Sequence, residues 1–461
     1  MEHRACEQIA SVNRQEMRHV LFPTEDSLDQ RGEINKEVRF FYDRHLNGEQ
    51  QQAVQKIVSG ASRPAPYLVF APPGTGKTVT LLEAIKQVHV LIGSSYILAC
   101  APENSAADLL AERLLAHVDR GKLFRMYATS RPWDFVPPKL KARRVMQQNL
   151  SVSSLWQTSW TPITPGAVSW CLQLGPILRS PISQKYGLEI SLLERLMTSC
   201  PAYTRGPSGN YNSNLLTKLM NNYRSHRAII EIPKQLFYEN ELNECAGDFR
   251  NMMIGWEELP NKNFPIIFHP VFGKDEREGS SPSFFNVAEV ATIERYPRKL
   301  LDDNVRSRGL KHLRPEMIGV ISPYKRQVQK IQKMIEKRRF GDEIKVGSVE
   351  EFQGQERGVV ILSTVRCTKK EYLEMDKDFY LGFLNNAKRF NVAVTRAQAL
   401  LIVIGNPDML CLDKNWKTFV NYCRANDATV NVERKEKVED IADTLKRLNL
   451  FSAATSGDQL F

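Results

Sequence analysis

The spacing of apolar and polar residues predicts two stretches in which strands alternate with helices. In the first stretch, apolar runs at residues 67–70 and 96–100 predict strands. Apolar residues at helical spacing cover residues 49–58, 79–88 and 105–117. Strands that alternate with helices are typical of a parallel sheet covered by helices. We therefore expect the first stretch to form an α/β domain.

A second α/β series follows. Ordered patterns return at 192–197 and 215–238, and the later strands are predicted at 264–268, 318–321, 358–362 and 400–404, with helices over 327–337 and 390–396. Because 461 residues are too many for one hydrophobic core, we expect two domains. The predicted layout is a lead-in helix and linker over 1–45, domains over 46–200 and 201–428, and a tail over 429–461.

Residues 135–172 do not fit this pattern. The chain has little periodicity from Arg131 to Ser169 and is rich there in Pro, Ser, Thr and Gln. No acidic residue occurs between Asp134 and Glu189. We therefore predict that the first domain is incomplete.

Composition narrows the class of protein. The apolar fraction of 42% and charged fraction of 25% are those of a soluble globular protein. No apolar run approaches the roughly 18 residues of a membrane span. The eight cysteines never form a CxxC pair, which favours a reducing compartment and argues against structural zinc. A net charge of +11 suits a polyanionic partner without proving one.

The stretch APPGTGKT at residues 71–78 lies between a predicted strand and a predicted helix. This order is the phosphate-binding loop, in which backbone N–H groups and a helix N-terminus point at phosphates. Lys77 would reach the β- and γ-phosphates of ATP, and Thr78 would hold Mg²⁺. The alternative is a glycine-rich turn that binds nothing, which the spacing and the strand–helix context disfavour.

Other polar residues accompany this loop in a fixed order along the chain. The Gln50 carboxamide has a donor and an acceptor for an adenine edge, although Asn47 beside it could simply cap a helix. Arg224, Glu356 and Arg396 lie in three later polar segments. An arginine stabilises charge on a transferring phosphoryl group. Taken singly, each segment is better explained by a cap or a surface salt bridge, and only their order with the phosphate loop favours a shared function.

Taken together, the motifs resemble those of superfamily-one RNA helicases of the nonsense-decay type, particularly the Moloney leukaemia virus ten and Armitage branch involved in RNA silencing. The stretches that carry the resemblance include APPGTGKT, ILACAPENSAADLL, NNYRSHRAI, GVISPYKRQV, VGSVEEFQGQE and NVAVTRAQALLIVIGNP. The resemblance covers residues 42–134 and 173–421.

The resemblance implies two RecA-like parallel-sheet domains with ATP and Mg²⁺ in the cleft. By this resemblance, Gln50 would contact adenine and Tyr223 would stack on it. Glu356 would bind the ribose. The residues expected to hold phosphates and Mg²⁺ are Gly74, Thr75, Gly76, Lys77 and Thr78. Gln173 and Arg224 would sense the γ-phosphate, and Arg396 would act as the arginine finger.

The resemblance also implies single-stranded RNA as the partner, with movement from 5′ to 3′. The residues expected to line the RNA path are Pro102, Asn104, Ser322, Pro323, Tyr324 and Thr364. Silencing ribonucleoprotein proteins of the Argonaute type, cytoplasmic ribonucleoprotein granules (P-bodies) and the absence of a membrane are the matching expectations. A DNA helicase of the same superfamily stays open, because no motif reads the 2′-OH.

The chain departs from this family at one point. Relatives of this type carry an apolar strand ending in Asp-Glu, where Asp holds Mg²⁺ and Glu activates water. No such strand occurs between Val79 and Gln173. We expect an exon omission, a frameshift or a gene-model error. Two functions follow as hypotheses: an ATP-dependent RNA helicase, or a catalytically impaired fragment that binds ATP and RNA.

Overall fold

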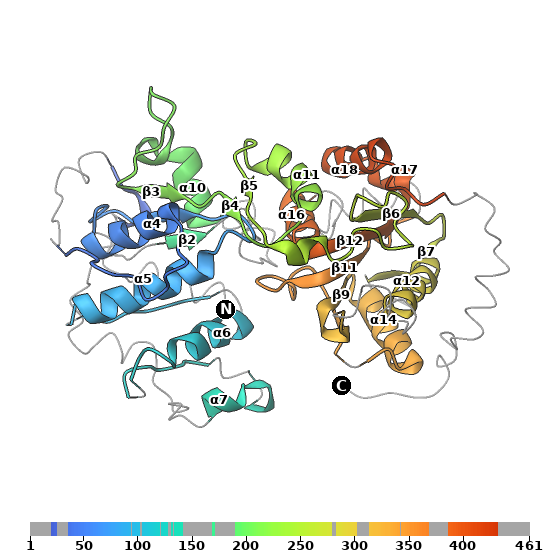
Figure 1. Cartoon of the computed structure of the whole chain (residues 1–461), viewed down its shortest axis with the longest axis horizontal. Helices are drawn as coiled ribbons and strands as arrows, with labels where there is room; N and C mark the ends of the chain where they lie inside the picture. The colour runs from blue at the N-terminus through green and yellow to red at the C-terminus, as the bar shows by residue number, and fades with distance from the viewer. Residues whose placement is uncertain are drawn as a thin grey trace. The chain divides into compact units, whose positions relative to one another are not determined.

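The computed structural model describes residues 20–24, 36–93, 95–101, 104–119, 121–127, 131, 133–141, 168–170, 190–278, 283–301, 313–341, 343–367 and 386–431. The chain divides into two compact units (Figure 1). Unit 1 comprises residues 1–171 and 175–220, and unit 2 comprises residues 172–174 and 221–461. The division falls twenty residues after the expected 200/201 boundary, because residues 216–218 pair with the first strand of unit 1.

Unit 1 is built on a short parallel sheet. Its elements are α4 (Gly48–Ser59), β1 (Leu68–Phe70), α5 (Lys77–Leu91), α6 (Asn104–Leu114), η1 (Trp133–Phe135), α7 (Pro138–Lys141), β2 (Val168–Trp170), α10 (Leu192–Ser199), η2 (Pro201–Tyr203) and β3 (Leu216–Lys218). The strand order is β2-β1-β3, and both pairings are parallel. The helices predicted at 49–58, 79–88 and 105–117 are confirmed as α4, α5 and α6, with α6 ending three residues early, and the ordered pattern at 192–197 is the helix α10.

The strand predicted at residues 96–100 is wrong. The segment has no strand assignment, and all five side chains are exposed, Tyr96 by 75% and Leu98 by 70%. Both positions next to β1 are occupied, by β2 and β3. An apolar run becomes a strand only where a ladder partner satisfies its backbone. Within the described residues, this segment has none.

Unit 2 contains a five-stranded, wholly parallel sheet of order β10-β9-β11-β12-β6. Its strands are β6 (Ile266–Pro270), β9 (Ile318–Ile321), β10 (Lys345–Gly347), β11 (Arg357–Ser363) and β12 (Ala397–Gly405). The predicted strands at 264–268, 318–321, 358–362 and 400–404 are confirmed as β6, β9, β11 and β12, within two residues at all but one end.

The helices of unit 2 are α11 (Arg227–Phe237), α12 (Val287–Leu300), α14 (Lys325–Arg338), α16 (Ala387–Val394), α17 (Pro407–Leu410) and α18 (Lys414–Ala425). Short elements complete it: β4 (Asn221–Asn222), β5 (Asn243–Glu244), η3 (Asp248–Asn251), β7 (Asp275–Arg277), β8 (Phe284–Asn286) and η4 (Pro315–Met317). The helix predicted at 390–396 is α16 and ends at Val394, so Arg396 lies in the turn before β12.

Two apolar clusters lie on the two faces of this sheet. Along β11, Val360 and Leu362 belong to one cluster, whereas Val359 and Ile361 belong to the other. This alternation follows from the two-residue repeat of a strand. The first cluster includes side chains of α11, α16 and α18, and the second includes side chains of α12 and α14. Unit 2 is therefore a three-layer α/β domain, visible in Figure 1 as helices on both sides of the sheet.

Several predicted segments lie wholly or partly outside the residues that the structure describes. Most of the lead-in segment over 1–45 and of the tail over 429–461 lies outside the described residues. In the irregular stretch 135–172, the structure describes residues 135–141 and β2. In the parts of the chain that the structure describes, no helix is long and apolar enough to cross a membrane.

Candidate nucleotide site and nucleic-acid interface

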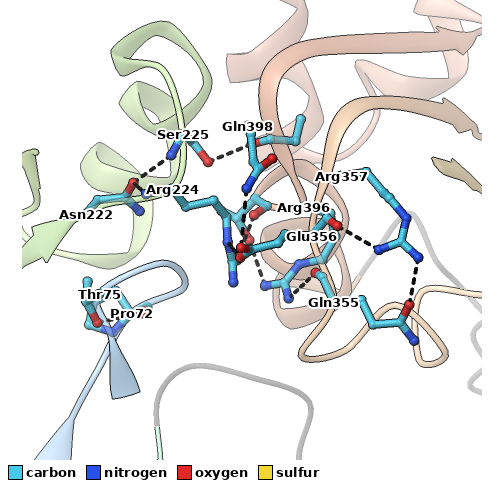
Figure 2. A network of polar contacts seen from close by, with 12 residues as sticks. Pro72, Thr75, Asn222, Arg224, Ser225, Gln355, Glu356, Arg357, Arg396 and Gln398 are labelled. Carbon is cyan, nitrogen blue, oxygen red and sulfur yellow. Dashed lines mark hydrogen bonds and ion pairs between the residues drawn. The ribbon is translucent and has the colours of Figure 1, made fainter. Parts of the chain in front are cut away.

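The phosphate-binding loop of unit 1 has the backbone that its sequence requires. Gly74 and Gly76 have φ of +80° and +84°, values that glycine adopts without strain. Between them, the buried Thr75 hydroxyl donates to the Pro72 carbonyl over 2.8 Å, which tightens the loop (Figure 2). α5 begins at Lys77 directly after the loop. The first N–H groups of that helix are therefore available to an anion.

Gln50 buttresses this loop from α4. Its Nε2 donates to the Thr75 carbonyl over 3.3 Å, and its Oε1 accepts from the Asn47 backbone N–H over 3.0 Å. Asn47 caps the helix in return, so the predicted capping alternative is confirmed. A Cβ at Gly76 would lie 2.2 Å from Gln50 Nε2. The structure thus gives Gln50 a buried, loop-supporting role, and its contact with adenine stays a prediction.

Glu83 and Gln87 of α5 hold a neighbouring segment, a role that no motif in the sequence indicated. The Glu83 carboxylate is buried and accepts from the backbone N–H groups of Tyr42 and Asp43 over 2.8 and 3.2 Å. One turn further on, Gln87 donates to the Phe40 carbonyl over 2.8 Å. These bonds hold residues 40–43 on the helix that follows the phosphate loop. Glu83 lies between the apolar residues Leu82 and Ala84 in the sequence, and this was the only available signal.

The expected catalytic carboxylates have no counterpart on the strand beside the loop strand. β2 runs parallel to β1 with Trp170 opposite Phe70, and the next two residues in the sequence are Cys171 and Leu172. Among the described residues, no group of three or more His, Cys, Asp or Glu could hold a metal ion. The phosphate cradle fits a nucleotide, whereas no Asp lies at the end of β2, as far as the structure describes it, to complete a Mg²⁺ site with Thr78. Gln173 lies outside the described residues.

Asp108 could have replaced a missing carboxylate, but it is already paired. It is buried on α6 and forms ion pairs with Arg125, at 2.9 Å, and with Arg131. Asn104 starts the same helix, and its side chain accepts from Arg125 over 3.2 Å. Arg125 therefore ties the expected RNA contact Asn104 to Asp108. Pro102 lies outside the described residues.

In unit 2, Arg224, Glu356 and Arg396 lie in one polar network (Figure 2). Arg224 pairs with Glu356 and donates to the Thr395 carbonyl over 3.1 Å. Asn222 fixes the turn that carries Arg224, because its Oδ1 accepts from the backbone N–H groups of residues 224 and 225. Three segments that are far apart in sequence thus meet, and Arg224 and Glu356 form the salt bridge that the sequence left open for such segments.

Arg396 is buried in this network. Its Nε donates to the Val392 carbonyl over 2.9 Å, and its Nη1 donates to the Gln355 carbonyl over 3.2 Å. Its relative exposure is 1%, so the guanidinium braces the glycine turn after β10 in this structure. The arginine-finger role stays a prediction. The ring of Tyr223, by contrast, is 44% exposed and offers a stacking face.

The four expected RNA contacts of unit 2, Ser322, Pro323, Tyr324 and Thr364, lie at the carboxyl ends of β9 and β11, where open α/β sheets bind ligands. The side chains of Ser322, Tyr324 and Thr364 are nevertheless buried. In this structure these side chains do not form an exposed surface, and their contact with RNA stays a prediction. Pro323 is partly exposed and Lys325 is exposed at the start of α14, so these two present the edge to solvent.

Comparison with known proteins places this geometry in context. Two AAA domain families match the chain, one over residues 45–160 and one over residues 188–408. A Danio rerio protein named as helicase mov-10-B.2 is 41% identical, with 98% of this chain and 50% of that protein covered. A Gallus gallus protein named as helicase MOV-10 is 45% identical, with 84% and 47% covered. The Homo sapiens RNA helicase Mov10l1 is 42% identical, with 84% and 36% covered.

The two AAA matches and the parallel sheets define the fold, RecA-like α/β domains. The named relatives add the class, a superfamily-one helicase. Within this class, the chain is of the MOV-10 type. It spans about half the length of the curated relatives it matches. The alignment with mov-10-B.2 covers 516 positions, 55 more than the 461 residues here (516 − 461), so that relative has residues without counterparts in this chain.

Proposed function

We propose that this chain is an ATP-dependent RNA helicase or translocase that acts on single-stranded RNA. The observation that carries the proposal is the phosphate-binding loop, with Gly74 and Gly76 in the left-handed region and α5 starting at Lys77. This arrangement presents backbone N–H groups and a lysine to the β- and γ-phosphates of ATP. Thr78, the first-turn hydroxyl, would contact Mg²⁺.

RNA as the substrate is supported by chemistry and by family membership. The formal net charge of +11 favours a phosphate backbone, and Lys325 is exposed at the predicted interface. The human relative is named as an RNA helicase. Movement from 5′ to 3′, a role in RNA silencing with Argonaute-type proteins, and a place in cytoplasmic ribonucleoprotein granules complete the proposal.

A second candidate is a catalytically impaired module that binds ATP and RNA. One observation favours it: β2, the strand beside the loop strand, is followed by Cys171 and Leu172 instead of Asp and Glu. Without a carboxylate there, Mg²⁺ loses an anchor and the attacking water loses its base. Nucleotide binding would persist while turnover fell to background.

One experiment tests the nucleotide site and separates the two candidates. ATP binding and RNA-stimulated ATP hydrolysis are measured on the purified chain and on Lys77→Ala. Because a hydrogen bond to a charged group is lost, ATP affinity should fall at least about tenfold. Lys86→Ala, on the same helix, is the matched control and should leave affinity unchanged. Unchanged affinity in Lys77→Ala would defeat the phosphate-loop proposal, and ATP binding without turnover would favour the impaired module.

A further inference from the structure

The chain makes a strained turn directly after β11. The backbone N–H of Arg366 donates to the Thr364 carbonyl over 2.9 Å, which closes a three-residue γ-turn. Val365, at its centre, has a φ of +71°. A β-branched residue rarely adopts this conformation, and it persists only where surrounding contacts hold it. Val365 is fully buried, so the neighbours that hold it can be identified.

The start of α12 supplies those contacts. Both carboxyl oxygens of Glu289 accept from the Val365 N–H, over 2.9 and 3.0 Å, and Oε2 also accepts from the Ser363 hydroxyl over 2.6 Å. Asn286, the N-cap of the same helix, donates through Nδ2 to the Val365 carbonyl over 3.1 Å. Both backbone polar groups of the strained residue are therefore bound by two side chains of one helix start.

The γ-turn at Val365 also supports the carboxyl end of the neighbouring strand, β9. Val365 packs in a separate apolar cluster with Phe284 and Tyr324. Tyr324 is the N-cap residue of α14, directly before the exposed Lys325. β9 and β11 are paired in parallel, so their carboxyl ends form one edge of the sheet. A contact chain thus leads from Glu289 through Val365 and Tyr324 to the exposed part of the predicted RNA edge.

We propose that Glu289 is a positioning residue for RNA binding: it holds the Val365 turn, which packs against Tyr324 and fixes the start of α14 at the nucleic-acid edge. This inference rests on the proposed RNA-binding function. Preorganisation of an edge before binding raises affinity, because less ordering is needed on association. Loss of Glu289 should therefore weaken RNA binding without touching the phosphate loop, which belongs to unit 1.

Three variants of the full chain test the proposal. Glu289→Ala removes the acceptors of the Val365 N–H. Glu289→Gln keeps one acceptor at nearly the same position. Glu294→Ala is the matched control, because Glu294 is a buried glutamate of the same helix that pairs with Arg298 and Arg338 instead. The measurements are affinity for fluorescent oligouridine, affinity for a nucleotide analogue, and amide hydrogen exchange over residues 363–367.

We expect roughly tenfold weaker RNA binding and faster exchange at the turn in Glu289→Ala, with nucleotide affinity unchanged. Glu289→Gln should stay within about threefold of the natural chain, since it retains an acceptor. Equal RNA affinity in Glu289→Ala and Glu294→Ala would overturn the proposal. So would parallel loss of RNA and nucleotide affinity, which indicates general unfolding. If the natural chain binds no RNA, the proposed function fails instead, and hydrogen exchange at the turn still decides the positioning role.

A second substitution, at Val365, separates the coupling between Glu289 and the turn from a general loss of stability. Glycine adopts a φ of +71° without strain, so Val365→Gly should need Glu289 less. In the Glu289→Ala background, Val365→Gly should recover at least part of the lost RNA affinity despite the packing that it removes. Strictly additive losses in the double variant would contradict the coupling between the two residues.

Discussion

The largest sheets of the two units differ in the number and length of the strands that the structure describes. Unit 2 has five parallel strands, of which β12 spans nine residues, and apolar clusters cover both faces. Among the residues that the structure describes, the sheet of unit 1 has three strands of three residues each, and the apolar run at 96–100 stays outside it. Similar strand signals in the sequence therefore gave different results. The comparison teaches that an apolar run needs its neighbouring strands before it can become part of a core.

The largest expected effect comes from completing unit 1. Insertion between residues 141 and 172 of an apolar strand ending in Asp-Glu, with the helices that relatives carry there, should raise RNA-stimulated ATP hydrolysis by about 10²–10⁴. The physical reason is the restored Mg²⁺ anchor and general base. Steady-state ATPase assays of the two chains measure this. The same insert with Asp-Glu replaced by Asn-Gln is the control. High turnover in the natural chain would contradict the expectation.

Single truncations should show the same contrast in stability. Ile361→Ala in β11 removes a fully buried side chain and should lower the free energy of unfolding by about 2–5 kcal/mol. Leu98→Ala removes a side chain that is 70% exposed and should change the free energy of unfolding by less than about 0.5 kcal/mol. Denaturant titrations followed by fluorescence measure both. Similar losses for the two variants would mean that residues 96–100 are packed after all.

The stability of unit 2 should depend on pH through Glu289. Burial raises the pKa of this carboxyl from 4.5 to about 8, with Asp275 adding to the rise and hydrogen bonds from Ser363 and Val365 opposing it. Between pH 4.5 and about pH 8, the Glu289 carboxyl is ionised in the unfolded chain and protonated in the folded chain. The contribution of Glu289 to stability is therefore fully present below about pH 4.5 and is lost towards pH 8, by about 1.4 kcal/mol per pH unit.

The control for this pH dependence is Glu289→Gln, which cannot ionise. Unfolding titrations between pH 5 and 8 should show a shallower decline for this variant than for the natural chain. Parallel curves would show that Glu289 does not titrate with the raised pKa that its burial implies.

The smallest effect concerns one exposed charge. Lys325→Ala should weaken binding of single-stranded RNA similarly for all sequences and lower the slope of log affinity against log salt by about 1. Lys417→Ala, an exposed lysine on α18, is the matched control and should leave the slope unchanged. Anisotropy titrations at several salt concentrations measure this. A slope that is identical in all three proteins would remove Lys325 from the interface.

Sequence patterns predicted unit 2 well because its signals are periodic and continuous. The residue spacing fixed β9 at its observed bounds and located the phosphate loop before α5. The patterns could not show that Arg396 and Thr364 are buried, since burial depends on segments distant in sequence. Glu289 and Val365 carried no motif at all. Their importance follows from a positive φ and its hydrogen bonds, which only coordinates reveal.

The exposed apolar run at residues 96–100 should make self-association of this protein depend on its concentration. Five consecutive residues with apolar side chains and no ladder partner among the described residues offer a template for strand addition by another chain. Such pairing grows with the square of concentration. We therefore expect a dilute chain to stay monomeric and an abundant one to self-associate, so that dosage governs whether this protein persists in solution.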